Sequence, residues 1–274
     1  MARFPARLHV LLARKAPVGL VIRRGPSNCV ATIHWDRRTD RFCLGQWLRG
    51  RIYERRCDLS PDGVHVIYFA MNGRWQSEVK GSYTALARAP YLKAVTLFPK
   101  GDCWQGGGLF TTSQRYWLNG CHAEPKYDSG DCRLDPDFRP TGSYGGECPS
   151  VYYRRLLRDG WQLTDRLSAG STERWDIFEK PVGGGWVLRK IAHADVGALR
   201  GRACYWDEHE LVHAVSSRCE HHPDWEWADL DGKRLVWASG GILHAGTIGR
   251  RGLTERRSLY DCNDMGFERR IAPY

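Results

Sequence analysis

The sequence predicts an all-β fold, and three observations support this class. Short β-rich stretches alternate with turn residues, as at 8–13, 18–23 and 30–35. Aromatic residues make up 12% of the chain and glycines number 30, a balance that suits many short strands and turns. Long helical periodicity, which the crossover connections of a parallel sheet require, is missing from the pattern. We therefore expect antiparallel sheets joined by short turns.

The first predicted unit is a four-stranded meander. After the three stretches above, a polar turn at 36–40 leads into a fourth strand at 41–48. Four strands in about 40 residues is the size of one propeller blade.

The second unit contains a phrase that the chain repeats. Residues 57–73 read CDLSPDGVHVIYFAMNG, and residues 228–241 read ADLDGKRLVWASGG. In the first copy Pro61 sets φ and Gly63 supplies a left-handed turn position. Further strands are predicted at 64–70, 82–89 and 94–98. Two hairpins of one pattern indicate a repeat architecture.

The remaining chain divides into hairpins and one long connection. Residues 106–120 read as strand, turn and strand, and 121–149, rich in Pro, Gly and Asp, predict a long loop or insertion. Hairpins follow at 151–165, about Asp159-Gly160, and at 173–193, with Gly183–Gly185 at the turn. The tail, 258–274, is expected to lie against the N-terminal strands.

These elements predict one domain, 1–274, that forms a small β-propeller of five four-stranded blades. We expect the ring to close by pairing one terminal segment with the other. Six blades or a β-sandwich are the alternatives.

The Asp-Leu-Ser-Pro-Asp-Gly run at 58–63, with the apolar strand after it, resembles the strand-turn-strand of TolB-type and WD-repeat propellers. The stretch 228–243 is similar to the same element. The chain also resembles single-domain bacterial propeller proteins of no known activity. Because TolB-type and WD-repeat propellers mostly serve as platforms for partners, the resemblance implies a binding role.

Basic residues supply the candidate ligand-binding groups. Net charge is +10, but the basic residues are scattered, which makes nucleic acid a less favoured partner than an unknown protein or a small anionic ligand. Guanidinium groups bind carboxylate and phosphate in bidentate fashion, and turn residues add donors. The candidates lie in two segments: Arg23, Arg24, Ser27 and Asn28, and then Arg51, Arg55 and Arg56.

Residues His209, Glu210 and His213 match the H-E-x-x-H pattern of zinc hydrolases. On a helix the two histidines bind zinc, Glu210 serves as the base, and Cys219 would be the third ligand. The surrounding residues predict a strand, in which the histidines would lie about 13 Å apart. We therefore favour no metal, and this hydrolase is an alternative.

A non-catalytic metal site formed by Cys219, His221 and His222 is a second alternative. The ten cysteines contain no C-x-x-C pair, and the N-terminal apolar run is too short for a signal peptide. No stretch reaches the ~20 apolar residues of a membrane span. We expect a cytoplasmic, non-catalytic binding or scaffold protein with reduced thiols, no cofactor and no membrane partner.

Overall fold

The computed structural model describes residues 4–25, 28–120, 122–169, 173–195, 203–216 and 218–274. These residues form five sheets, built mainly of antiparallel pairs, and one α-helix, which confirms the all-β class. The chain divides into two compact units. Unit 1 comprises Met1–Phe4, His9–Arg155 and Met265–Tyr274, and unit 2 comprises Pro5–Leu8 and Leu156–Asp264.

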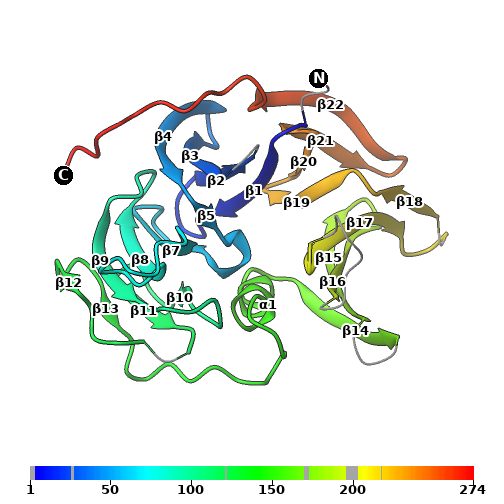
Figure 1. The fold of residues 1–274 in the computed structure, drawn as a ribbon. Coiled ribbons are helices and arrows are strands. Elements are labelled where there is room, and N and C mark those ends of the chain that lie inside the picture. The colour runs from blue at the N-terminus through cyan, green and yellow to red at the C-terminus, as the bar shows by residue number, and fades with distance from the viewer. Residues whose placement is uncertain (1–3, 26–27, 121, 170–172, 196–202, 217) are drawn as a thin grey trace. The chain divides into compact units, whose positions relative to one another are not determined.

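The first sheet is the predicted four-stranded meander. Its strands lie in the order of the sequence (Figure 1) and are β1 (Arg7–Leu12), β2 (Val18–Arg24), β3 (Cys29–Asp36) and β4 (Arg41–Arg49). Most residues of β2 and β3 are buried, as their nearly continuous apolar sequences require.

The second sheet contains the first copy of the repeated phrase. Its order is β12-β9-β8-β7-β5, and β6 pairs with β7. The strands are β5 (Arg51–Ile52), β6 (Asp58–Leu59), β7 (His65–Met71), β8 (Ser82–Arg88), β9 (Ala94–Pro99) and β12 (Tyr127–Asp128). The 3-10 helix η1 (Glu54–Arg56) separates β5 from β6. The three predicted strands over 64–98 are therefore confirmed.

The third sheet consists of β10 (Gly108–Phe110), β11 (Arg115–Leu118) and β13 (Arg133–Leu134), with β13 parallel to β11. The predicted connection at 121–149 is not simply a surface loop. It contributes β12 to the second sheet and β13 to the third, although Cys121 lies outside the described residues. The segment is thus attached at two points of unit 1.

A helix, α1 (Pro149–Arg158), replaces the hairpin expected at 151–165. Asp159-Gly160 marks the end of this helix. Gly160 has φ +89°, the Gly160 amide donates to the Leu157 carbonyl, and the Trp161 amide donates to the Leu156 carbonyl. This is a Schellman ending, in which glycine takes the left-handed position after the helix. An Asp-Gly pair is common both in hairpin turns and just after helix ends, so its presence does not tell which of the two forms.

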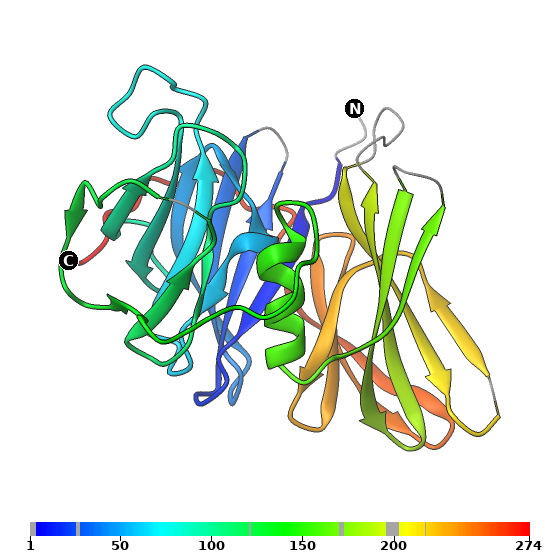
Figure 2. The same cartoon turned by 90° about the horizontal axis from the view of Figure 1, so that it is seen from below.

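Unit 2 contains the fourth sheet, whose five strands follow the order of the sequence (Figure 1); Figure 2 shows the same strands from below. They are β14 (Gln162–Ala169), β15 (Glu173–Gly183), β16 (Trp186–Asp195), β17 (Tyr205–His213) and β18 (Cys219–His222). The predicted hairpin at 173–193 is confirmed, because Gly183 pairs with Trp186 across its turn.

The fifth sheet is again a four-stranded meander of β19 (Trp225–Asp231), β20 (Arg234–Ser239), β21 (Ile242–Gly249) and β22 (Gly252–Asp261). Among the described strands, β22 pairs with β21 and β1 pairs with β2, so the expected pairing of terminal segments is not found. The last residues do contact an early strand: Gln46 of β4 donates to the Arg270 carbonyl at 2.9 Å, and Arg270 donates to the Leu44 carbonyl at 2.8 Å.

The aspartate of each repeated phrase connects two sheets. Asp58, which is 2% exposed, accepts a hydrogen bond from the Phe110 amide of β10 at 2.8 Å. In the second copy, Asp229 of β19 accepts from Lys180 of β15 at 2.6 Å and from the Trp161 indole at 3.2 Å. Each copy therefore uses the same residue type to hold a neighbouring sheet within its own unit.

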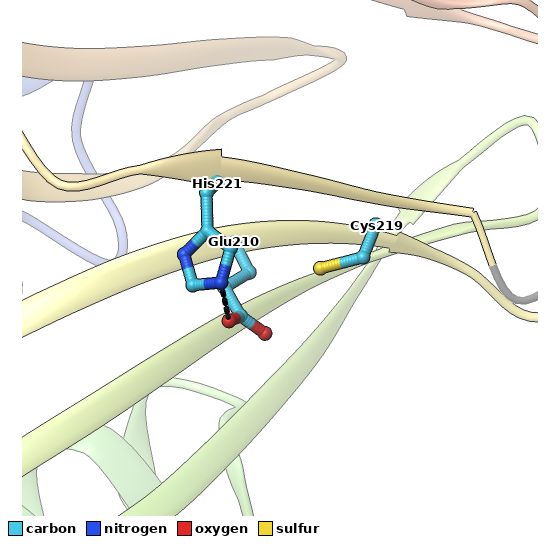
Figure 3. Close-up of side chains that lie close together, drawn as sticks. All are labelled: Glu210, Cys219 and His221. Carbon is cyan, nitrogen blue, oxygen red and sulfur yellow. Dashed lines mark ion pairs between the residues drawn. The ribbon is translucent and has the colours of Figure 1, made fainter.

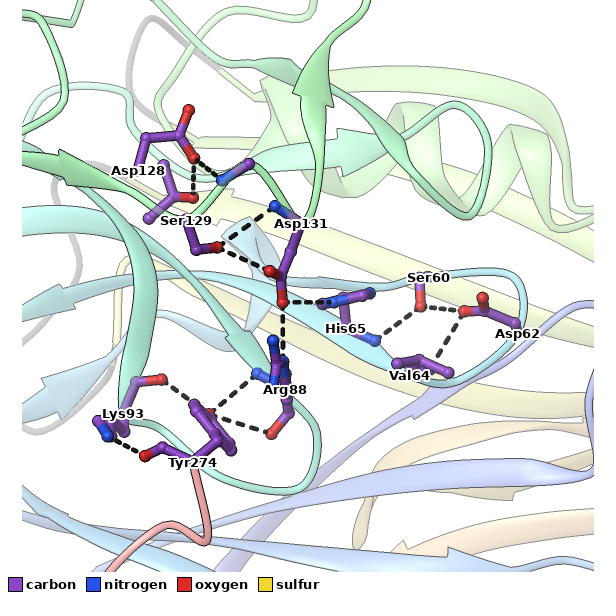
Figure 4. A network of polar contacts seen from close by, with 12 residues as sticks. Ser60, Asp62, Val64, His65, Arg88, Lys93, Asp128, Ser129, Asp131 and Tyr274 are labelled. Carbon is purple, nitrogen blue, oxygen red and sulfur yellow. Dashed lines mark hydrogen bonds and ion pairs between the residues drawn. The ribbon is translucent and has the colours of Figure 1, made fainter.

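A polar network in unit 1 fixes the segment after β12 (Figure 4). Asp131 accepts from Arg88 at 2.7 Å and lies 3.5 Å from the imidazole of His65. The Tyr274 hydroxyl donates to the Lys93 carbonyl at 2.8 Å and accepts from the Arg88 amide. The hydrogen bond from Arg88 holds the pKa of Asp131 down, at about 2.

Asp131→Asn should lower the free energy of unfolding by about 1 kcal/mol at neutral pH, allowing for solvent screening of the pair. A carboxylate whose pKa is depressed on folding stabilises the protein above its unfolded pKa, near 4. The stabilisation is lost as the pH falls through about 2. Denaturant unfolding at neutral and acid pH measures this, with Asp137→Asn, at an 88% exposed side chain, as the control. If Asp131→Asn lowered the free energy of unfolding equally at pH 7 and pH 2, the stabilisation would not come from the ionised Asp131 carboxylate.

Gly160→Ala should destabilise the protein by about 1 kcal/mol, because a side chain at φ +89° is strained where α1 ends. Gly249→Ala is the matched control, since a Cβ there meets nothing within 4 Å and no left-handed φ is involved. Thermal unfolding compares the two variants. Equal stability of both would argue against the helix ending described above.

Candidate functional site

The 3-10 helix η1 of unit 1 gathers arginine side chains from distant parts of the sequence. The Tyr53 amide donates to the Phe69 carbonyl at 3.0 Å, which ties the start of η1 to β7. The Cys57 amide donates to the Glu54 carbonyl and closes the turn. Arg55 and Arg56 therefore project from a short, fixed segment between β5 and β6. We call the group Arg24, Arg51, Arg55, Arg56 and Arg155 the arginine cluster.

Arg56 is interior and largely structural. It is 3% exposed and donates to the backbone carbonyls of Cys103 and Gln105, at 2.8 Å for Cys103. Its Nε lies 3.3 Å from the Cys148 sulfur, and Glu147 lies 3.9 Å from its Nη2. This guanidinium links η1 to the segment before β10 and to the residues before α1.

Arg155 of α1 approaches η1 from the helix side. It is 5% exposed and donates to the carbonyls of Glu54 and Cys57. Its Nη2 lies 2.7 Å from Nε2 of His9, which must act as the acceptor because a guanidinium only donates. Backbone carbonyls accept these hydrogen bonds without cancelling the positive charge of Arg155.

Two tyrosine rings each lie beside two guanidinium groups. Arg51 and Arg56 lie 4.5 Å and 4.8 Å from the ring centre of Tyr53. The other ring belongs to Tyr152, and Arg55 and Arg155 both lie 5.3 Å from its centre. Such cation–π contacts stabilise the guanidinium groups and hold their planes in place.

The members of the cluster that reach solvent are Arg24, Arg51 and Arg55. Arg51 is exposed, and Arg24 is half-buried and forms a 3.0 Å ion pair with Glu54. The side chains named here carry five positive charges and, in Glu54 and Glu147, two negative ones. The arrangement can therefore attract and hold an anion at its exposed edge.

The other residues of the first predicted segment do not join the cluster. Arg23 is 2% exposed, lies 5.2 Å from the ring centre of Trp47, and donates to the carbonyls of Gly25 and Met265. This interior position does not fit the expected ligand-binding role. Asn28 is exposed with φ +51°, as a turn residue, and its carbonyl accepts from the Gly50 amide. Ser27 lies outside the described residues.

The thiols beside the cluster are unsuited to nucleophilic chemistry. Burial raises the pKa of Cys57 to about 12 and also raises the pKa of Cys148, against the lowering effect of Arg56. Burial likewise raises the pKa of Tyr53, although Arg51 and Arg56 oppose it. These groups stay protonated at neutral pH, and only thiolates are good nucleophiles.

The H-E-x-x-H residues lie on strand β17 of unit 2, not on a helix. His209 is fully buried, with Nε2 2.7 Å from Nζ of Lys190 and Nδ1 2.9 Å from the Trp225 carbonyl. Since Lys190 donates to Nε2 and Nδ1 donates to the carbonyl, His209 is neutral and both its nitrogens are occupied.

His213 lies in a different environment. Its Nδ1 accepts from the Ser216 amide at 3.2 Å, and its ring lies edge-on to Trp186 with the centres 5.1 Å apart. Four residues of strand separate His213 from His209, a distance of about 13 Å. The two histidines cannot share an ion, so the geometric basis of the alternative hydrolase, with Glu210 as base and Cys219 as third ligand, is removed.

A different set of the same residues does come together on β17 and β18 (Figure 3). Glu210, Cys219 and His221 place one carboxylate oxygen, the sulfur and one ring nitrogen within 4.8 Å of one another. His222, which the sequence also suggested, faces the other way and stacks on Trp225 at 3.8 Å between ring centres. We call Glu210, Cys219 and His221 the strand triad.

Sequence reasoning missed His9, Tyr152 and Arg155, which complete the arginine cluster. Tyr152 and Arg155 belong to the helix that was read as a hairpin. A signal for this helix was present: Pro149 is its first residue and Gly160 follows its end, the usual asymmetry of helix termini. No sequence signal places His9 near α1.

The nine described cysteines are free, and Cys121 lies outside the described residues. No described helix is long and apolar enough to cross a membrane.

No family model and no curated protein matches the chain. Among solved structures, hydrazine synthase of Kuenenia stuttgartiensis is similar with a TM-score of 0.32 and 11% sequence identity, over 89% of this chain and 74% of that chain. A likeness at this level carries no argument about function.

Arg56→Met should lower the free energy of unfolding by about 3 kcal/mol, because it removes the interior guanidinium that joins η1 to the carbonyls of Cys103 and Gln105. Arg51→Met is the matched control on the same tyrosine ring. Arg51 is exposed, so its loss should change stability by no more than about 0.5 kcal/mol. Denaturant unfolding of both variants tests whether Arg56 supports the fold and Arg51 does not. A similar loss of stability in the two variants would contradict this assignment.

Proposed function

We propose that the protein is a non-catalytic binding protein of propeller type, and that its five sheets are the blades of a small β-propeller like those of the TolB and WD-repeat classes. Support comes from the order of the sheets. The first, fourth and fifth sheets each use one continuous part of the chain, and the first and last are plain four-stranded meanders, the form of a propeller blade.

The ligand of this proposal is a small anion that carries a carboxylate or phosphate group, bound at the exposed edge of the arginine cluster. One observation carries it: two tyrosine rings hold four guanidinium groups around η1. The hydrogen bonds of Arg155 to neutral carbonyls leave its charge in place to attract an anion, whereas Glu147, 3.9 Å from Arg56, offsets part of the charge of Arg56. Arg51 then supplies the exposed, ring-supported donor.

A nucleic acid would also respond to positive charge, but a backbone needs a row of phosphate contacts over an extended surface. The arginine cluster is compact and is fixed around one short helix. A small ligand therefore fits it better than a polymer does.

Arg51→Gln should weaken anion binding about tenfold, equivalent to about 1.4 kcal/mol. Isothermal titration of the full chain with inorganic pyrophosphate and with citrate, at low salt, measures the affinity. The matched control is Arg74→Gln, at an exposed arginine of unit 1 outside the cluster.

The control variant should bind as the unchanged protein does. Equal weakening in both variants would show general charge attraction and defeat the proposal, as would failure of both anions to bind. Tight binding of a single-stranded oligonucleotide that pyrophosphate does not displace would favour a polymer ligand instead.

A further inference from the structure

The strand triad is produced by the pairing of β17 with β18. In this antiparallel ladder Glu210 lies directly opposite His221, and Val212 lies opposite Cys219. Because alternate residues of a strand share a face, Cys219 and His221 are on the side to which Glu210 points. Figure 3 shows the sulfur and the imidazole both directed toward the Glu210 carboxylate. We infer that Glu210, Cys219 and His221 form a zinc-binding site.

The distances suit a tetrahedral ion. Nε2 of His221 lies 3.0 Å from Oε1 of Glu210. In a tetrahedral zinc site with bonds of about 2.0 Å, such a nitrogen and oxygen lie about 3.3 Å apart. The sulfur, within 4.8 Å of both atoms, needs only a small side-chain movement to reach its position.

A chain of ion pairs orients the Glu210 carboxylate on the side away from His221. Oε2 of Glu210 lies 3.2 Å from Arg189 of β16, which in turn lies 2.8 Å from Glu179 of β15. These residues are cross-strand partners on one face, in the order Glu179, Arg189, Glu210 and His221. Partners of this kind orient ligands and raise metal affinity. With Oε2 held by Arg189, Oε1 is the oxygen presented to the ion.

The donor set selects the kind of metal. Thiolate and imidazole ligands suit zinc and similar ions, whereas magnesium and calcium take six or more oxygen ligands. A zinc ion with Glu210 and the Cys219 thiolate forms a neutral site, and the thiol proton is released on binding. The exposed positions of Cys219 and His221 leave the ion accessible from solvent, with water as the fourth ligand.

Cobalt(II), which takes the place of zinc and reports its ligands by absorption, tests the site. The full chain without a histidine tag should bind one cobalt ion with a thiolate-to-cobalt charge-transfer band, and zinc should displace it. Cys219→Ser should abolish the band. His221→Ala should weaken binding at least tenfold, and because His221 has a 64% exposed side chain, this variant should fold normally.

Cys43→Ser removes an exposed cysteine of another sheet and should leave the band unchanged. His222→Ala removes the neighbouring imidazole that faces away and should leave affinity unchanged. Absence of a band in the unchanged protein would overturn the site. A band that survives Cys219→Ser, or that Cys43→Ser removes, would assign the cobalt to another thiol and overturn it as well.

Discussion

The aspartate of the repeated phrase, which is buried as Asp58 and half-buried as Asp229, is the constraint on which the arrangement of sheets depends. A carboxylate removed from water costs several kcal/mol unless hydrogen bonds replace its hydration. Asp58 accepts a hydrogen bond from the Phe110 amide, and Asp229 accepts from Lys180, Trp161 and the Leu230 amide. The donors Phe110, Lys180 and Trp161 lie outside the aspartate's own hairpin, whereas the Leu230 amide belongs to it. A hairpin therefore gains these outside hydrogen bonds only when its neighbour is in place, which couples sheet formation to sheet packing within each unit.

The need to pair interior polar groups also explains why arginine side chains gather in the arginine cluster. Arg56 and Arg155 act as cross-links, because each guanidinium donates to carbonyls of a chain segment far from the arginine in sequence. Carbonyl acceptors satisfy the guanidinium hydrogen bonds but leave the charge in place, unlike an acidic partner. The residues that stabilise this part of unit 1 are thus the ones that make it electropositive. The anion binding proposed above would draw on the same side chains as stability, with Arg51 added at the exposed edge.

Local pattern could predict the strands because turn residues delimit them: the meander at 8–48 and the hairpin at 173–193 agree with the structure. The helix was missed since its aromatic residues and following Asp159-Gly160 read equally well as a hairpin. Arg51, Arg55 and Arg56 were predicted as a group because they are close in sequence. The position of Arg155 in the arginine cluster depends on tertiary packing, which a local sequence pattern does not contain. Cys219 and His221 of the strand triad were predicted as a pair with His222. The register of β17 and β18 places Glu210, and not His222, beside them.

Each unit is assembled from separated pieces of the chain, and this bears on synthesis. Residues 265–274 belong to unit 1, although all of 156–264 belongs to unit 2. A ribosome that has completed β1 to β13 has therefore not yet supplied Arg270 and Tyr274, which form hydrogen bonds with Gln46 and Arg88. Domains usually fold in order as they emerge. Here unit 1 can reach its final form only after unit 2 has been translated, which gives the nascent chain a late, C-terminal step of maturation.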